Sequence, residues 1–180
     1  MGEKIELETR QKIYNFIQKH PGVHEREISR RLNIPLSTID YHLHFLSKRQ
    51  LISPSQDGHY KKYYTTGKIS VKEKKILGIL RQKPKRIIII FLLLNPNSPH
   101  KKICRYLNLS ASTTTFHLNK LVEFEIINKF PIGRETIYYI KNPEYISDLL
   151  ITYKKSFVDD MVQRFSDSWL ELHPKNIRNQ

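Results

Sequence analysis

Two stretches of the chain carry hydroxyl, imidazole, phenol and amide side chains at helical spacing. The first holds Ser37, Thr38, Asp40, Tyr41 and His44. The second, 75 residues further on, holds Ser112, Thr113, Thr115, Phe116, Asn119 and Lys120. The side chains of the first stretch have the size and chemistry to contact the edges of bases in a groove of a nucleic acid. The second stretch is less polar, so we expect base contacts first from the first stretch.

Basic side chains flank both stretches and could hold the phosphates of the same ligand. They are Arg26, Arg30, Arg31, Lys48, Lys61 and Lys62 for the first stretch, and Arg134 for the second. The formal net charge is +14, and the surplus lies in the first 142 residues, because residues 143–180 hold 5 Lys/Arg against 6 Asp/Glu. Such a surplus favours a polyanionic partner, either nucleic acid or an anionic membrane surface.

The two stretches belong to one module that occurs twice. Ile13–Tyr64 aligns with Ile88–Tyr139 without a gap, and 16 of the 52 aligned positions are identical. His42 and His117 are equivalent in this alignment, as are Leu43 and Leu118. A repeat of this kind determines the domain organisation before any single motif does.

Each module predicts three helices followed by a two-stranded hairpin. In the first copy, apolar spacing and the His20-Pro21-Gly22 break predict helices over Glu3–Lys19, Glu25–Leu32 and from Ser37 onward. Ser37 is expected to cap the third helix, with Asp40 as its acidic partner. A strand is expected to begin at Leu51-Ile52, residues 53–59 to form the turn, and Tyr60–Thr65 to form the return strand.

The second copy predicts the same plan. Its expected helices are Arg86–Leu94, His100–Leu107 and Ser112–Glu125, with a turn over Asn95–Pro99 and hairpin strands over Ile126–Phe130 and Thr136–Ile140. The apolar run Ile87–Leu94 is too short to span a bilayer and is expected to be a buried helix.

A connector and a tail complete the chain. Residues 68–87 form a basic connector, with an expected helix from Val71 to Gln82 that Pro84 ends. Residues 143–180 are expected to form one long helix from Glu144 to about Leu172, with apolar side chains at intervals of three and four. This apolar stripe must be covered by protein, either a second copy of the chain or the chain's own core.

The motif Ser-Thr-Ile-Asp-Tyr-His-Leu-His-Phe-Leu at 37–46, followed by Leu51-Ile52, resembles the recognition-helix signature of ArsR- and MarR-like winged-helix regulators. Ser112–Leu121 resembles it as well, so the resemblance covers residues 13–65 and 88–140. Tandem chains of this kind are similar to archaeal winged-helix transcription regulators. The metal-sensing members of the family carry paired cysteines, whereas Cys104 is the only cysteine here.

The resemblance implies a fold class that is mainly α with small β-hairpin wings. The expected domains are residues 1–67 and 88–142, each a winged helix-turn-helix, joined by 68–87 and followed by 143–180. It also implies a transcription regulator that binds double-stranded DNA, with the third helix in the major groove and the wing on the backbone or minor groove. By this inference the stretches and basic residues named above are the DNA-binding residues.

Two other classes remain open at this point. A winged helix can serve as a protein-interaction module of a transcription or replication assembly, and a basic tandem chain can hold structured RNA. The tail is expected either to form a homodimer contact, which two-fold symmetric reading of half-sites favours, or to cover its own domain.

Catalytic and metal chemistry find little support in the residue pattern. The pair His20 and His24 has the bare spacing of four, but Pro21-Gly22 breaks the helix that would align the two rings, and no such pair is joined by a carboxylate at a spacing that would define a metal site. No glycine-rich phosphate loop is present. His42 and His117 are expected to be packed structural residues. We therefore expect no enzyme, no metal, no cofactor and no membrane partner, and a single cysteine suits the cytoplasm.

Overall fold

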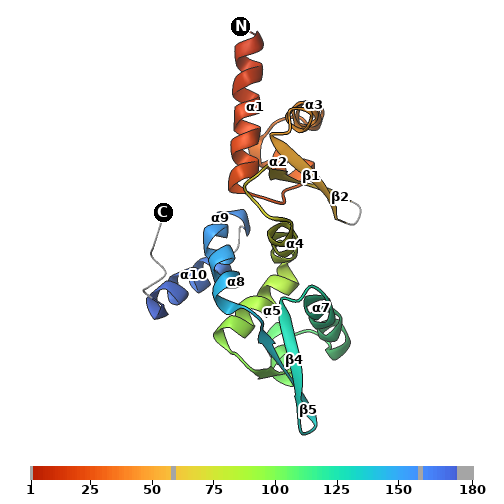
Figure 1. The fold of residues 1–180 in the computed structure, drawn as a ribbon, viewed down its shortest axis with the longest axis vertical. Coiled ribbons are helices and arrows are strands. Elements are labelled where there is room, and N and C mark those ends of the chain that lie inside the picture. Colours follow the sequence, from red (N-terminus) through yellow and green to blue (C-terminus); the bar gives the residue numbers. More distant parts are fainter. Residues whose placement is uncertain (1, 58–59, 158–159, 174–180) are drawn as a thin grey trace. The chain divides into compact units, whose positions relative to one another are not determined.

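The computed structural model describes residues 2–57, 60–157 and 160–173 and places them in two compact units, Met1–Gly78 and Ile79–Gln180 (Figure 1). Each unit contains one copy of the sequence repeat. The expected fold class is confirmed, because helices dominate and each unit ends its repeat in an antiparallel hairpin.

The first unit has the predicted order of elements. It consists of α1 (Gly2–Lys19), α2 (Glu25–Leu32), α3 (Leu36–Lys48), β1 (Ile52–Asp57), β2 (Tyr60–Thr65) and most of α4 (Val71–Leu80). Its core gathers apolar side chains from the three helices and the first strand, among them Ile13, Ile28, Leu43 and Ile52. These positions follow the helical spacing seen in the sequence, so burial of one face drives the packing.

The turn between α2 and α3 depends on Asn33. Its backbone is left-handed, with φ 54°, and this conformation ends α2. α3 then begins at Leu36 after Pro35, and no side chain in the described part of the chain caps its first turn. The expected cap by Ser37 is therefore wrong: the cap position is Pro35, two residues earlier, which places Ser37 inside the first turn with its side chain exposed.

The first wing is longer than the sequence indicates. β1 continues through Asp57, and its register with β2 pairs Ile52 with Thr65 and Asp57 with Tyr60. The expected turn over residues 53–59 is therefore strand up to Asp57, and its last two residues lie outside the described part. The wing is tied to the helices by a bridge in which Tyr63 N–H donates to the Val23 carbonyl at 2.9 Å.

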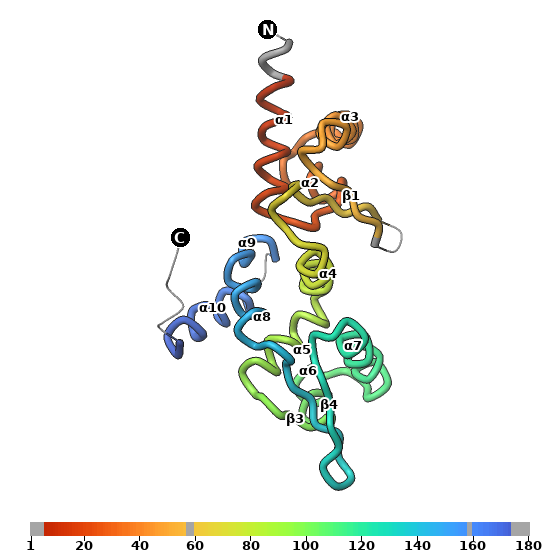
Figure 2. The backbone as a smooth tube through the Cα atoms, in the orientation of Figure 1, coloured from red at the N-terminus to blue at the C-terminus, as the bar shows by residue number. Residues whose placement is uncertain are grey.

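The second unit repeats this plan with one more strand. It contains α5 (Lys83–Leu94), β3 (Ser98–Pro99), α6 (His100–Leu107), α7 (Ala111–Glu123), β4 (Ile127–Ile132) and β5 (Glu135–Ile140). The trace in Figure 2 follows α5 through β3 and α6 to α7. The sheet order is β3-β5-β4. The sequence places a turn where β3 forms, and Ser98 pairs with Tyr138 just as the equivalent Val23 pairs with Tyr63.

Local geometry confirms that the two copies are equivalent. Asn108 ends α6 in the left-handed conformation, with φ 52°, as Asn33 ends α2. α7 is capped by Ser110, whose Oγ accepts from the Thr113 N–H at 3.2 Å, so this helix begins before the predicted Ser112. α5 is buried over Ile88–Leu93, which confirms the prediction of a buried apolar helix.

One helix ends and another begins within the connector. α4 stops at Leu80, and α5 starts at Lys83 with Pro84 in its first turn. Pro84 therefore begins a helix, because a proline at the first turn has no N–H that would need a partner. α4 is held to the first wing: the Tyr64 hydroxyl donates to the Lys74 carbonyl at 3.2 Å, and Lys74 Nζ donates to Ser53 Oγ at 2.7 Å.

The predicted single tail helix is wrong. The stretch is divided into α8 (Pro143–Thr152), α9 (Lys154–Phe157) and α10 (Asp160–Leu172). α8 ends at Thr152, with Tyr153 as its C-cap, and α10 packs against α8 and α5. The apolar residues Ile146, Leu150, Phe165 and Trp169 are buried. A straight helix would leave part of this stripe in water, and division of the helix lets both halves cover the second unit.

Candidate nucleic-acid interface

α3 presents one continuous exposed stripe. Ser37, Tyr41, His44 and Lys48 are all exposed, and they recur at intervals of four, three and four residues. The opposite face is fixed in the core by Ile39, His42, Leu43 and Leu46. Tyr41 is 54% exposed, which is unusual for a large aromatic side chain and leaves both its ring and its hydroxyl available to a ligand. Asp40 is also exposed, whereas Thr38 is half-buried at the side of the stripe.

Basic side chains of the first unit differ in how available they are. Arg26 and Arg30 on α2 are exposed. Arg31 is half-buried: its guanidinium lies 3.4 Å from Glu27 and 4.9 Å from the centroid of the Phe16 ring. We infer that Arg31 holds α2 against α1 and is less free to reach a phosphate than its two neighbours.

The first wing contributes Lys61 and Lys62 unequally. Lys61 is exposed and lines a pocket of about 250 Å³ together with His24, Glu25, Arg26, Gln56 and Tyr60. Lys62 is half-buried, and its Nζ donates to the Gly78 carbonyl at 3.5 Å. The pocket joins the start of α2 to the wing, so Arg26 and Lys61 face one opening.

α7 presents the equivalent stripe of the second unit. Ser112, Phe116, Asn119 and Glu123 are exposed at the positions of Ser37, Tyr41, His44 and Lys48. Lys120 is half-buried, and its Nζ lies 2.8 Å from the Glu123 carboxylate. Thr113 and Thr115 flank the stripe, and the Thr113 hydroxyl lies 2.8 Å from Ser110 Oγ. The stripe therefore has the same place as that of α3 but a different chemistry.

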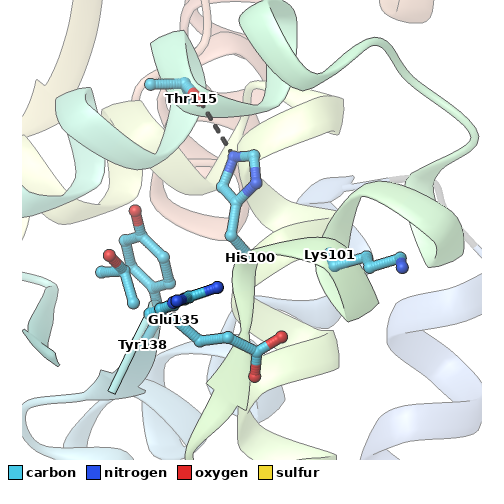
Figure 3. Close-up of a pocket in the computed structure, with 7 residues that line it drawn as sticks. His100, Lys101, Thr115, Glu135 and Tyr138 are labelled. Carbon is cyan, nitrogen blue, oxygen red and sulfur yellow. Dashed lines mark hydrogen bonds between the residues drawn. The ribbon is translucent and has the colours of Figure 1, made fainter. Parts of the chain in front are cut away.

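A second pocket lies beside α7 and contains residues that the sequence did not indicate. Its volume is about 420 Å³, and it is lined by His100, Lys101, Thr115, Arg134, Glu135, Thr136 and Tyr138 (Figure 3). Among them, Thr115 and Arg134 were expected as ligand contacts. His100 and Lys101 were not, because their role depends on the fold of the wing over the start of α6.

The His100 ring connects α6 to α7. Its Nε2 lies 2.9 Å from the Thr115 hydroxyl, which itself donates to the Ala111 carbonyl at 2.8 Å. Since the hydroxyl proton is used by Ala111, Nε2 must carry the proton and donate to Thr115. Nδ1 lies 3.5 Å from Cys104 Sγ. The ring is fixed at both nitrogens, so it orients the recognition helix of this unit.

His42 and His117 are packed beneath the two stripes, as expected. Burial lowers the pKa of His42 below its usual 6.5, with a further lowering by the Arg10 charge that Glu6 partly opposes. Burial also lowers the pKa of His117, with a contribution from Lys85. Nδ1 of each ring is buried and has no hydrogen-bond partner among the residues that the structure describes. Both histidines are therefore neutral structural residues near neutral pH.

The described residues contain no cluster of three or more His, Cys, Asp or Glu side chains that could hold a metal ion. Among the same residues, no helix combines the length and apolar character needed to cross a membrane.

Comparison with known families assigns both copies. Residues 7–77 match an N-terminal HTH domain model, and residues 83–129 match the model of the bacterial regulatory protein arsR family. The chain carries two helix-turn-helix domains in tandem. The expected resemblance to ArsR-like proteins is confirmed, and the α2–α3 and α6–α7 pairs are its helix-turn-helix units.

A curated relative supports the same assignment. The chain is 35% identical over 139 residues to an uncharacterized HTH-type transcriptional regulator of the archaeon Methanocaldococcus jannaschii. The match covers 77% of this chain and 35% of the relative, so the chain spans about a third of that protein's length.

Solved structures overlap with the chain only in part. Lactococcus lactis ZitR (a C30AH42A mutant) matches with a TM-score of 0.36 and 15% identity, over 79% of this chain and 84% of that chain. The PcaV transcriptional regulator from Streptomyces coelicolor matches with a TM-score of 0.35 and 14% identity, over 77% and 83%. At such scores the matches carry no argument about function.

Proposed function

We propose that this tandem helix-turn-helix protein is a transcription regulator that reads double-stranded DNA through α3 of its first domain. The observation that carries the proposal is the exposed stripe of Ser37, Tyr41, His44 and Lys48 on a helix whose other face is fixed in the core. A rigid helix with exposed hydrogen-bonding side chains has the dimensions that a major groove admits. The name of the M. jannaschii relative, an HTH-type transcriptional regulator, supports the same function.

In this proposal, phosphate contacts come from side chains around the stripe. Arg26, Arg30 and Lys61 are exposed, and Lys48 ends the stripe itself. Each phosphate neutralised by such a side chain releases counterions, which supplies affinity without sequence information. The base-facing members of the stripe then supply the preference for one sequence over another.

The α7 surface is proposed as a second, weaker DNA contact. Ser112, Thr113, Phe116 and Asn119 are exposed there, and Arg134 extends from the second wing. Lys120 is occupied by Glu123, and Thr115 is occupied by His100 and Ala111. These two residues therefore support the surface and contribute less to ligand contact.

Binding to the promoter DNA of the protein's own gene, measured across a salt series with random duplex as competitor, tests the function. A preference for the promoter that persists near 0.15 M salt is expected. If binding to both duplexes decreases equally as the salt concentration rises, the protein binds DNA only through its positive charge, and the proposal is overturned. A parallel series with double-stranded RNA distinguishes an RNA-binding module, which would hold RNA at least as tightly.

The tail is proposed to cover its own domain. Ile146, Leu150, Phe165 and Trp169 are already buried within the second unit, so little of the stripe remains for a partner subunit. A sedimentation measurement that gives a monomer over micromolar concentrations is the expected result. A dimer that persists on dilution would restore the homodimer prediction. The cytoplasmic location remains a prediction from the sequence.

A further inference from the structure

The two recognition helices differ at equivalent exposed positions. Tyr41, His44 and Lys48 of α3 correspond to Phe116, Asn119 and Glu123 of α7. All six side chains are exposed, so the difference is a difference in what each helix offers to a ligand. The first stripe is polar and basic, whereas the second offers a phenyl ring, a carboxamide and a carboxylate.

Asn119 lies in the middle of the second stripe. It is exposed, and its amide makes no hydrogen bond to the part of the chain that the structure describes. A carboxamide offers a donor and an acceptor side by side, which matches the N6 donor and N7 acceptor of adenine in the major groove. The same amide cannot satisfy the paired acceptors O6 and N7 of guanine with equal quality.

Phe116 is the neighbour of Asn119 on this stripe, one helical turn before it. The ring is 58% exposed and lies edge-on to the His117 ring, with centroids 5.4 Å apart. An exposed phenylalanine gains from an apolar contact, and the major groove supplies one at the C5-methyl group of thymine. Phe116 and Asn119 therefore favour the two partners of an A·T pair.

The second stripe also lacks the usual side chains for guanine. Arginine and lysine bind O6 and N7 of guanine most often. The one lysine beside the stripe, Lys120, is held 2.8 Å from the Glu123 carboxylate. A guanine contact would have to break this ion pair, whereas an adenine contact by Asn119 leaves it intact.

The second wing also favours A·T pairs, through contacts in the minor groove. Arg134 follows Gly133, whose positive φ of 57° forms the tip of the hairpin. Arg134 is exposed and makes no ion pair within the described chain, and Ile132 beside it is 58% exposed. A narrow minor groove at A·T-rich sequence attracts arginine through its enhanced negative potential, and apolar wing residues fit where no G amino group protrudes.

From these contacts we propose that the second domain reads an A·T-rich segment. Asn119 pairs with adenine, Phe116 contacts a thymine methyl group, and Arg134 enters the adjacent minor groove. The inference rests on the proposed function of DNA binding. Since the stripes of α3 and α7 differ, the two domains read different base sequences, and the chain recognises an asymmetric site.

Selection of duplexes from a random library by the full chain, followed by sequencing, tests the proposal. An A·T block on one side of the selected site is expected. Asn119→Ala should weaken binding to the selected duplex by roughly tenfold to a hundredfold, the value of one bidentate base contact. Asn119→Arg should change the preferred base at one position of the block from adenine to guanine, because arginine pairs with O6 and N7.

A matched control is Gln163→Ala, which removes an exposed carboxamide from α10 of the same unit. It should leave the selected sequence unchanged. If the wild-type chain selects no sequence at all, the proposed function itself fails. If it selects a site whose A·T block is absent, or is unaltered in Asn119→Arg, the function stands and the assignment of the second domain is overturned.

Discussion

The guanidinium of Arg10 lies 3.6 Å from the centroid of the Phe45 ring, and this contact holds α1 against the back of α3. Arg10 also lies 3.6 Å from the Glu6 carboxylate. The recognition stripe is therefore supported from behind by a helix that carries no base-reading residue.

Arg10→Met tests the strength of this support. Loss of the cation–π contact is expected to lower the free energy of unfolding by about 0.5–2 kcal/mol, because the side chain is mostly shielded from water. Urea unfolding followed by circular dichroism measures the change. Lys12→Met on the exposed face of α1 serves as control and should stay within about 0.5 kcal/mol of the wild type. Equal values for both variants would show that the stack contributes nothing.

The free energy of unfolding is expected to decrease at acidic pH because of His42 and His117. Burial lowers the pKa of both rings in the folded chain below 6.5, the usual value that the unfolded chain retains. Above pH 6.5 both states are neutral and the stabilisation is complete. As the pH falls through 6.5, the unfolded state takes up protons first, so stability is lost until the lower folded pKa is reached.

Urea midpoints at pH 7.5, 6.5 and 5.5 measure this loss. In the doubly substituted chain with His42→Leu and His117→Leu, the decrease between pH 6.5 and 5.5 should be smaller than in the wild type. The absolute stability of that variant does not matter, because the readout is its slope with pH. An unchanged slope would mean that other groups cause the acid sensitivity.

If α3 contacts bases, substitution of its exposed side chains should lower the affinity for cognate DNA more than that for random DNA. Tyr41→Ala or His44→Ala should weaken binding to the cognate duplex by roughly tenfold while random duplex binds nearly as before. Competition binding at fixed salt measures both values. Gln18→Ala, an exposed change on α1, should alter neither. Equal losses on cognate and random DNA from Tyr41→Ala would contradict its role in base reading.

The two lysines of the first wing are expected to differ. Lys61 is exposed at the wing pocket, so Lys61→Ala should weaken cognate and random DNA alike and reduce the salt slope by about one. Lys62 donates to the Gly78 carbonyl, so Lys62→Ala should change the slope less and the unfolding free energy more, by about 1 kcal/mol. Identical salt slopes for the two variants would show that both side chains reach phosphates.

The repeat allowed much of the fold to be predicted. α2 and α6 begin and end at the predicted residues, Glu25–Leu32 and His100–Leu107. Their limits are encoded locally, since each lies between a break that contains proline and an asparagine that adopts the left-handed conformation. The polar stripe of α3 could also be predicted from the sequence, because a helix that buries one apolar face exposes the opposite face to water.

The candidate site could be predicted only in part, because exposure depends on neighbours that are distant in the chain. Arg31 and Lys62 look like free cations in the sequence, yet Phe16 and the Gly78 carbonyl hold them. The role of His100 beside Thr115 appears only when α6 and α7 pack together. No local pattern contains these distances.

The sequence by itself determined the number of modules, their order of elements and the face of each recognition helix, because hydrophobic periodicity and turn residues act over a few positions. Tertiary structure decided where the tail breaks, where Ser98 joins the sheet and which cations remain available. Each of these results from burial against segments far away in the chain, such as α8 under α10 and β5 beside β3. Burial is a property of the packed domain, and no short stretch specifies it alone.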